Sequence, residues 1–179
     1  MTENRNSPTK LIAADLGIGW QTGLDLTIEM SPIAASANMK RNWNGRAKNL
    51  ATAEFMLYGF RISSGEGEQL PPALSSLWPG HIFSLVASNE VMVVIPTGSS
   101  TAVFPRNIYS ARGLTFDSHA VAGSFSGKTF TLPAPATEPV RVYARLQYEV
   151  IVWEPWRETY REAQAQTSWQ LYVEELGGI

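Results

Sequence analysis

The chain has 179 residues with 14 Lys or Arg, 16 Asp or Glu and a formal net charge of −2, which excludes binding to nucleic acid through bulk positive charge. Because 44% of the residues are hydrophobic and only 17% are charged, the chain is too apolar to be disordered throughout. It contains no cysteine, which excludes disulfides, thiolate catalysis and Cys-ligated zinc.

The N-terminal residues 1–10 are polar and have no apolar period, so we expect a flexible arm there and a single β-rich domain over residues 11–179. No apolar signal segment follows this arm. The longest purely apolar run, residues 91–95, is far shorter than the roughly 20 residues that a membrane-spanning helix needs. We therefore expect the protein to be made in the cytoplasm and to leave it only by lysis.

The first half of the chain is predicted to consist of short strands. Residues 24–31 alternate apolar and polar side chains, which is typical of a half-buried strand. Asn42-Trp43-Asn44-Gly45 contains the Asn-Gly pair that tight hairpin turns favour, so a hairpin tip is expected there. Two strands are expected to meet at Ser88-Asn89. The strands predicted after the hairpin are residues 55–62, 81–87, 90–95, 102–104, 113–116 and 129–132.

The C-terminal third carries the clearest strand pattern. The proline-rich residues 133–139 predict a stiff, extended connector. Residues 140–152 then alternate apolar and polar side chains, and residues 169–174 do so again, which predicts two strands with one solvated side. Residues 155–166 leave two interpretations open, one or two helical turns or a long hairpin arm. The whole pattern predicts a mainly β fold, an antiparallel β-sandwich or barrel-like domain with long hairpins and little helix.

One segment approaches a nucleotide-binding motif. Residues 122–129, A-G-S-F-S-G-K-T, resemble the phosphate-binding loop G-x-x-x-x-G-K-[ST], but Ala122 replaces the first glycine. In that motif the Lys-Thr pair opens a helix whose amides hold the phosphates. Here Thr129 leads into a strand-like segment that ends in proline. We therefore predict a β-turn at Ser126-Gly127 and no nucleotide site.

No catalytic or metal-binding arrangement can be assembled from the sequence. Asp117, Ser118 and His119 are the residue types of a nucleophilic triad, but sequence neighbours cannot adopt its geometry among themselves. The two histidines, His81 and His119, lie far apart and in no metal-binding spacing. We predict that the protein is not an enzyme and has no catalytic residue, cofactor, metal site or small-molecule substrate.

Charge and tryptophan are distributed unevenly along the chain. Residues 38–48 hold four basic residues and no acid, whereas residues 150–179 hold five Glu and two Arg. Either this is ordinary surface scatter, or complementary ends meet between copies of the chain; DNA contact by the basic tip is a weaker third option. Several tryptophans fall at turns and strand ends, and tryptophan is enriched at protein interfaces. We predict interface positions at Arg41, Trp43, Arg46, Trp78, Trp153 and Trp156.

Three blocks of sequence, taken together, resemble a family of uncharacterised structural proteins of tailed bacteriophages and prophages. Residues 31–45 resemble the family's P-I-x-x-A … R-x-x-N-G segment, and residues 168–176 resemble its closing strand. The most specific similarity is that of residues 69–80 to the block P-P-A-L-x-x-x-W-P-G. Members often carry cysteines near this block, and this chain has none.

The resemblance implies a structural component of the virion, most simply a tail or tail-tip/baseplate assembly protein located in the virion. Its partners would be other virion proteins and copies of itself, and no catalytic residues come with the family. Two alternatives remain open. One is a capsid decoration or neck protein, and the other is a carbohydrate- or receptor-binding module with Trp78 or Trp156 in a sugar-stacking groove.

Overall fold

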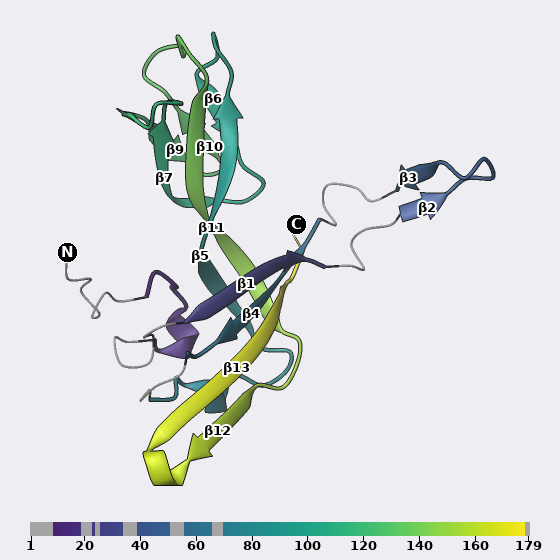
Figure 1. The fold of residues 1–179 in the computed structure, drawn as a ribbon, viewed down its shortest axis with the longest axis vertical. Helices are drawn as coiled ribbons and strands as arrows, with labels where there is room; N and C mark the ends of the chain where they lie inside the picture. Colours follow the sequence, from purple (N-terminus) through teal and green to yellow (C-terminus); the bar gives the residue numbers. More distant parts are fainter. Residues whose placement is uncertain are drawn as a thin grey trace. The chain divides into compact units, whose positions relative to one another are not determined.

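The computed structural model describes residues 9–18, 23, 26–33, 39–50, 56–65 and 70–177 (Figure 1). Strands account for 53% of the described residues and helices for 6%, and the sheets are antiparallel, so the predicted mainly β, sandwich-like fold is confirmed. Within the described part of the chain, no sheet closes into a barrel and no helix reaches seven residues. The predicted arm falls almost entirely outside the described residues.

The elements are numbered in chain order, with 3-10 helices marked η. They are η1 (Ala14–Leu16), β1 (Thr27–Pro32), β2 (Met39–Arg41), β3 (Ala47–Asn49), β4 (Tyr58–Ser63), η4 (Leu74–Ser76), β5 (Ile82–Ile95), β6 (Thr101–Val103), β7 (Ile108–Leu114), β8 (Ala120–Val121), β9 (Ser124–Ser126), β10 (Thr129–Thr131), β11 (Val140–Val152), β12 (Arg157–Arg161), η5 (Glu162–Gln164) and β13 (Gln166–Glu175).

The chain forms two compact units. Unit 1 comprises Met1–Ser84 and Glu149–Ile179, and unit 2 comprises Leu85–Tyr148. The strands β5 and β11 each contribute residues to both units. The single domain expected from the sequence stays a prediction, which the unfolding experiments in the Discussion test.

The sheet of unit 1 has the order β1-β4-β13-β11, and β12 pairs with the other half of β13 (Figure 1). Its side chains alternate between two faces, as a pleated strand requires. The buried face contains Phe60, Ile62, Leu171 and Val173. The opposite face, called the outer face below, is solvated. This alternation is the one expected from the period-two pattern at the C-terminus.

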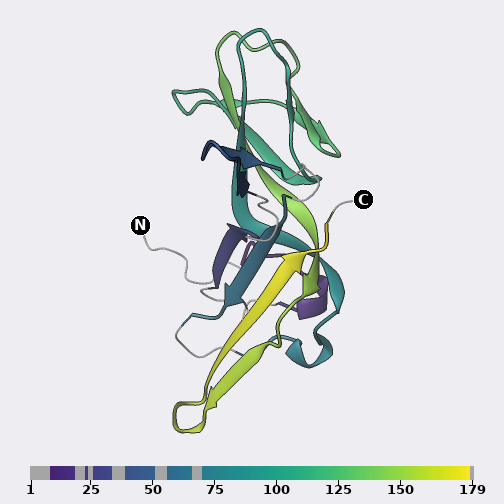
Figure 2. The ribbon, with the colours of Figure 1, turned by 90° about the vertical axis from the view of Figure 1, so that its right-hand side faces the viewer.

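Residues 155–166 adopt the hairpin alternative, and the helical one is wrong. The strand β12 pairs antiparallel with β13 from Arg157 opposite Gln170 to Arg161 opposite Gln166 (Figure 2). The short η5 closes the tip. A longer helix cannot form there because Ala165 has a left-handed φ of 49°, which ends the 3-10 turn.

Unit 2 holds a second sheet of order β6-β10-β9, and within this unit β7 pairs with β11 on one side and with β8 on the other. The predicted turn at Ser126-Gly127 is confirmed, because it joins β9 to β10 with Gly127 at a φ of 55°. Thr129 is therefore the first residue of the strand β10. A phosphate-binding loop would need a helix to begin there. β7 begins at Ile108, earlier than predicted, and β8 and β9 were not predicted.

The two strands expected on either side of Ser88-Asn89 are in fact one continuous strand, β5. A two-residue hairpin turn needs a positive φ, and neither Ser88 nor Asn89 has one. Both are half-buried within β5, which pairs with β11. Tertiary pairing thus overrides the local preference of Ser and Asn for turns.

The hairpin tip at Asn42-Trp43-Asn44-Gly45 is confirmed between β2 and β3. The amide of Gly45 donates to the carbonyl of Asn42 at 2.9 Å, and Gly45 has a φ of 76°. The amide of Arg46 donates to Asn42 Oδ1 at 2.9 Å. The asparagine side chain and the glycine conformation together fix this turn, which is why the sequence signals it so clearly.

The proline-rich residues 133–139 lie between β10 and β11 and form no strand. Ala136 is buried there, and its amide donates to the carbonyl of Ser99 while its carbonyl accepts from the amide of Gly98. The segment is therefore anchored to the turn that follows β5.

Candidate functional site

Most of the predicted interface residues lie at the surface of the chain. Trp43 is 96% exposed, Trp78 73% and Trp153 60%, whereas Trp156 is half-buried. Arg41 and Arg46 are exposed on the same hairpin as Trp43. The turn at Trp78 is hydrogen-bonded to the end of β11, where the amide of Gly80 donates to the carbonyl of Val152 at 2.9 Å. Trp78 and Trp153 therefore come from neighbouring segments, and contact with other chains stays a prediction for all of these residues.

The residue types of a nucleophilic triad lie in a single turn. The amide of Thr115 donates to the carbonyl of His119 at 2.9 Å, and Ser118 adopts a φ of 66°. Asp117, Ser118 and His119 are all exposed. The other histidine, His81, pairs with Asp15 at 2.9 Å on the surface, which joins η1 to the start of β5. Across the described ranges, no group of three or more His, Asp or Glu side chains could hold a metal ion.

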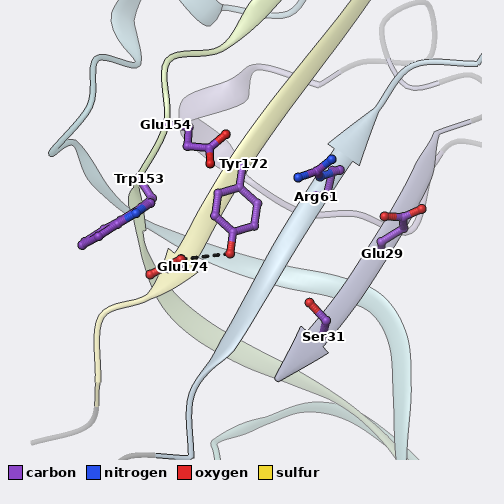
Figure 3. A pocket seen from close by; sticks show the side chains of 7 residues that line it. All are labelled: Glu29, Ser31, Arg61, Trp153, Glu154, Tyr172 and Glu174. Atoms are coloured by element: carbon purple, nitrogen blue, oxygen red, sulfur yellow. Dashed lines mark hydrogen bonds between the residues drawn. The ribbon is translucent and has the colours of Figure 1, made fainter. Parts of the chain in front are cut away.

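The outer face of unit 1 carries a pocket of about 340 Å³ (Figure 3). This pocket, called the outer-face pocket below, draws on three adjacent strands and on the segment after β11. Its lining residues are Glu29, Ser31, Arg61, Trp153, Glu154, Tyr172 and Glu174. The lining therefore contains three acidic side chains and one basic side chain. A smaller pocket of about 120 Å³ adjoins it through Arg61, Glu154 and Tyr172, and adds Arg157.

Strand register places these side chains in two rows. In one row Glu29 on β1 pairs with Arg61 on β4, and Arg61 pairs with Tyr172 on β13. The Arg61 guanidinium lies 5.7 Å from the centre of the Tyr172 ring, which is within the range of a cation–π contact. In the next row Ser31 and Glu174 both pair with Gly59. The amide of Trp153 donates to the carbonyl of Tyr172 at 3.4 Å, which brings the indole to the edge of the pocket.

The outer-face pocket depends on the absence of a side chain at Gly59. A Cβ atom at this position would lie 2.6 Å from Tyr172 Oη and 3.2 Å from its Cζ, so any larger residue would displace the ring. Tyr172 thus lies across the bare backbone of β4 and donates a hydrogen bond to Glu174 Oε1 at 2.9 Å (Figure 3). Glycine in a strand commonly marks such a close approach.

The pocket holds the phenol of Tyr172 in its neutral form. Burial, the hydrogen bond to Glu174 and the charges of Glu174 and Glu154 raise the pKa of Tyr172 from 10.0 to about 12. The positive charge of Arg61 acts in the opposite direction and is outweighed. Burial thus makes the largest contribution to the shift, and the two glutamates add to it.

The raised pKa predicts that alkali destabilises the native protein partly through Tyr172. Between about pH 10 and about pH 12, an unfolded chain loses this proton while the folded chain keeps it. The free energy of unfolding therefore falls as the pH rises through this window. We expect this fall to be steeper for the wild-type protein than for Tyr172→Phe, measured by urea denaturation at several pH values. Equal slopes for the two proteins would contradict the prediction.

Sequence reasoning predicted only one residue of the outer-face pocket, Trp153. Glu29, Arg61 and Tyr172 lie on the solvated sides of three strands, and no local pattern indicates that those strands are neighbours. A usable signal was present at Gly59, an isolated glycine inside a strand pattern. Such a glycine indicates that another side chain lies close to the strand, but it does not identify that side chain.

Comparison with known proteins does not identify this chain. No protein-family model, curated protein or solved structure matches it. In the part of the chain that the structure describes, no helix is both long and apolar enough to cross a membrane.

Proposed function

We propose that this chain is a structural component of a tailed-bacteriophage virion, in the tail or at its tip or baseplate, that acts through contacts with copies of itself and with other virion proteins. The observation that supports this proposal most directly is the exposure of Trp43, Trp78 and Trp153 in the isolated chain. Large aromatic side chains at this level of exposure are typical of surfaces that become buried on association. The sequence resemblance supplies the virion context.

The architecture suits assembly. Extended hairpins, such as β2–β3 and β12–β13, offer side chains and edge strands to neighbouring chains. In rings, contacts are head-to-tail, so one surface must complement a different surface of the next copy. The uneven charge of the chain fits this requirement, because the basic residues of the β2–β3 hairpin and the glutamates of the C-terminal third lie on different elements.

The test is the mass distribution of the purified protein over a range of concentrations, measured by mass photometry, with negative-stain images of the large species. We expect closed rings or other symmetric oligomers that grow with concentration. The variant Trp43→Ala/Trp78→Ala/Trp153→Ala should remain folded and shift towards the monomer. A wild-type protein that is monomeric at every concentration would contradict self-assembly, and an unchanged distribution for the triple variant would show that the indoles are not the contact.

The composition of the outer-face pocket favours a second candidate function. An exposed indole beside carboxylates and an arginine is also suited to binding a sugar, and Trp153 is placed in this way. A carbohydrate- or receptor-binding module is therefore the alternative proposal. Glycan binding by the isolated wild-type chain, lost in Trp153→Ala, would favour it. A capsid decoration or neck protein would share the assembly behaviour, and labelling of intact particles would distinguish its location.

A further inference from the structure

The β2–β3 hairpin carries a cationic face. Lys40 and Lys48 are directly paired across the two strands, so both side chains lie on the same face. Arg46 is two residues before Lys48, and its carbonyl accepts from the amide of Asn42, so it continues that face towards the tip. We call Lys40, Arg46 and Lys48 the basic face. All three residues are exposed, as is Trp43 at the tip.

This arrangement opposes the stability of the hairpin in the free chain. Like charges directly opposite each other destabilise an antiparallel pair, and a two-stranded hairpin alone is at best marginally stable in water. Arg41, on the other face, donates from Nη1 to the carbonyl of Gly45 at 2.8 Å and so contributes to the turn itself. Within the hairpin, the charges of the basic face only repel one another. An anionic surface on another molecule would offset this repulsion and stabilise the hairpin.

The outer-face pocket has the complementary chemistry. Glu29, Glu154 and Glu174 line it, and the aromatic rings of Trp153 and Tyr172 add surfaces on which a cation can lie. Arg61 is partly balanced by its position over the Tyr172 ring. Burial is the largest cause of the raised pKa of Tyr172, and the hydrogen bond to Glu174 and the charges of Glu174 and Glu154 raise it further against the opposing charge of Arg61. A volume of about 340 Å³ is at the small end of ligand sites, and suits side chains rather than a whole strand.

We propose that the basic face of one copy docks on the outer-face pocket of a second copy, with Arg46 and the paired lysines opposite Glu29 and Glu154 and with Trp43 beside Trp153. This inference rests on the proposed function and names the surfaces that would meet. The contact joins two different surfaces, so it is head-to-tail and can be repeated from copy to copy. Charge complementarity sets its register and excludes partners of the wrong sign.

Charge reversal on each side tests this contact. The basic-face variant is Lys40→Glu/Lys48→Glu, and the pocket variant is Glu29→Lys/Glu154→Lys. Either variant alone should associate at least about 100-fold more weakly than the wild type in sedimentation velocity, since like-charge contacts cost several kcal/mol. The control Lys128→Glu/Arg161→Glu makes the same change in net charge as the basic-face variant, at exposed positions outside the contact, and should associate like the wild type. Circular dichroism checks that each variant is folded.

Mixing the variants gives the decisive result. The basic-face variant keeps a wild-type pocket and the pocket variant keeps a wild-type hairpin. The two altered surfaces also have opposite charges, so an equimolar mixture should form mixed complexes that neither variant forms alone. Unaltered association of both variants, or no complex in the mixture, would overturn the proposed contact. If the wild type associates in that case, the proposed assembly function stands and only the contact is wrong. A wild type that never associates would overturn both.

Discussion

Phe60→Ala should lower the free energy of unfolding by about 3–5 kcal/mol, the usual loss for truncating a fully buried phenylalanine. Phe60 has no exposed surface, and it lies on β4 between Met30 on β1 and Val173 on β13. Its removal leaves a cavity at the centre of the unit 1 sheet. A loss of this size is a large part of the 5–15 kcal/mol that stabilises an ordinary domain.

Urea denaturation followed by tryptophan fluorescence measures the effect of Phe60→Ala. The matched control is Tyr160→Ala, which truncates an aromatic residue on β12 that is 61% exposed and should change stability by no more than about 0.5 kcal/mol. The denaturant dependence should stay constant for both variants, so that only the midpoint moves. Equal midpoints for the two variants would show that β4 is not at the centre of the core.

Gly123→Ala should destabilise unit 2 by about 1–3 kcal/mol, the typical cost of overpacking. A Cβ atom at Gly123 would lie 2.2 Å from Cζ and 2.7 Å from Cε1 of Phe130, so the ring must move. Phe130 is 1% exposed and lies on β10, between Ala102 on β6 and Phe125 on β9. Its ring therefore cannot shift without disturbing the second sheet.

A double-mutant cycle shows whether the ring is the cause. Phe130→Leu removes the atoms that the new methyl group would strike, so Gly123→Ala/Phe130→Leu should lose less stability than the sum of the two single changes. Ala122→Ser, at the adjacent exposed position, should be close to neutral. Strictly additive losses would exclude the collision as the mechanism.

The two variants also test the expectation of a single domain. Phe60 belongs to unit 1, and Gly123 to unit 2. If the chain unfolds as one domain, both substitutions should move the same single transition. If each variant moves a separate transition, the chain contains two domains that share the strands β5 and β11.

The proposed contact gives the exposed aromatic residues a specific role. Trp43 lies at the tip of the basic hairpin, and Trp153 lies at the edge of the outer-face pocket. Each is highly exposed in the isolated chain, and each would be covered in the same head-to-tail contact. Trp78, in the turn hydrogen-bonded to Val152, remains available for a further partner.

Features that depend on neighbouring residues could be predicted from the sequence. The period-two pattern of residues 140–152 predicts the strand that the structure shows as β11, with the same first and last residues, because alternation reflects which side of a strand is buried. The turns at Asn42-Trp43-Asn44-Gly45 and Ser126-Gly127 were predicted because glycine at a positive φ and the asparagine side chain act within a few residues.

Features that depend on contacts between distant segments could not be predicted from local sequence. Ser88 and Asn89 continue β5 because the strand pairs with β11, and residues 155–166 form a hairpin because β12 pairs with β13. The outer-face pocket likewise exists because β1, β4 and β13 are neighbours and because Tyr172 lies over Gly59. Local patterns predict the β class, the two turns named above and surface positions for Trp43, Trp78 and Trp153, whereas Trp156 is half-buried. Strand order and register, which no local pattern encodes, decided which charges and rings meet.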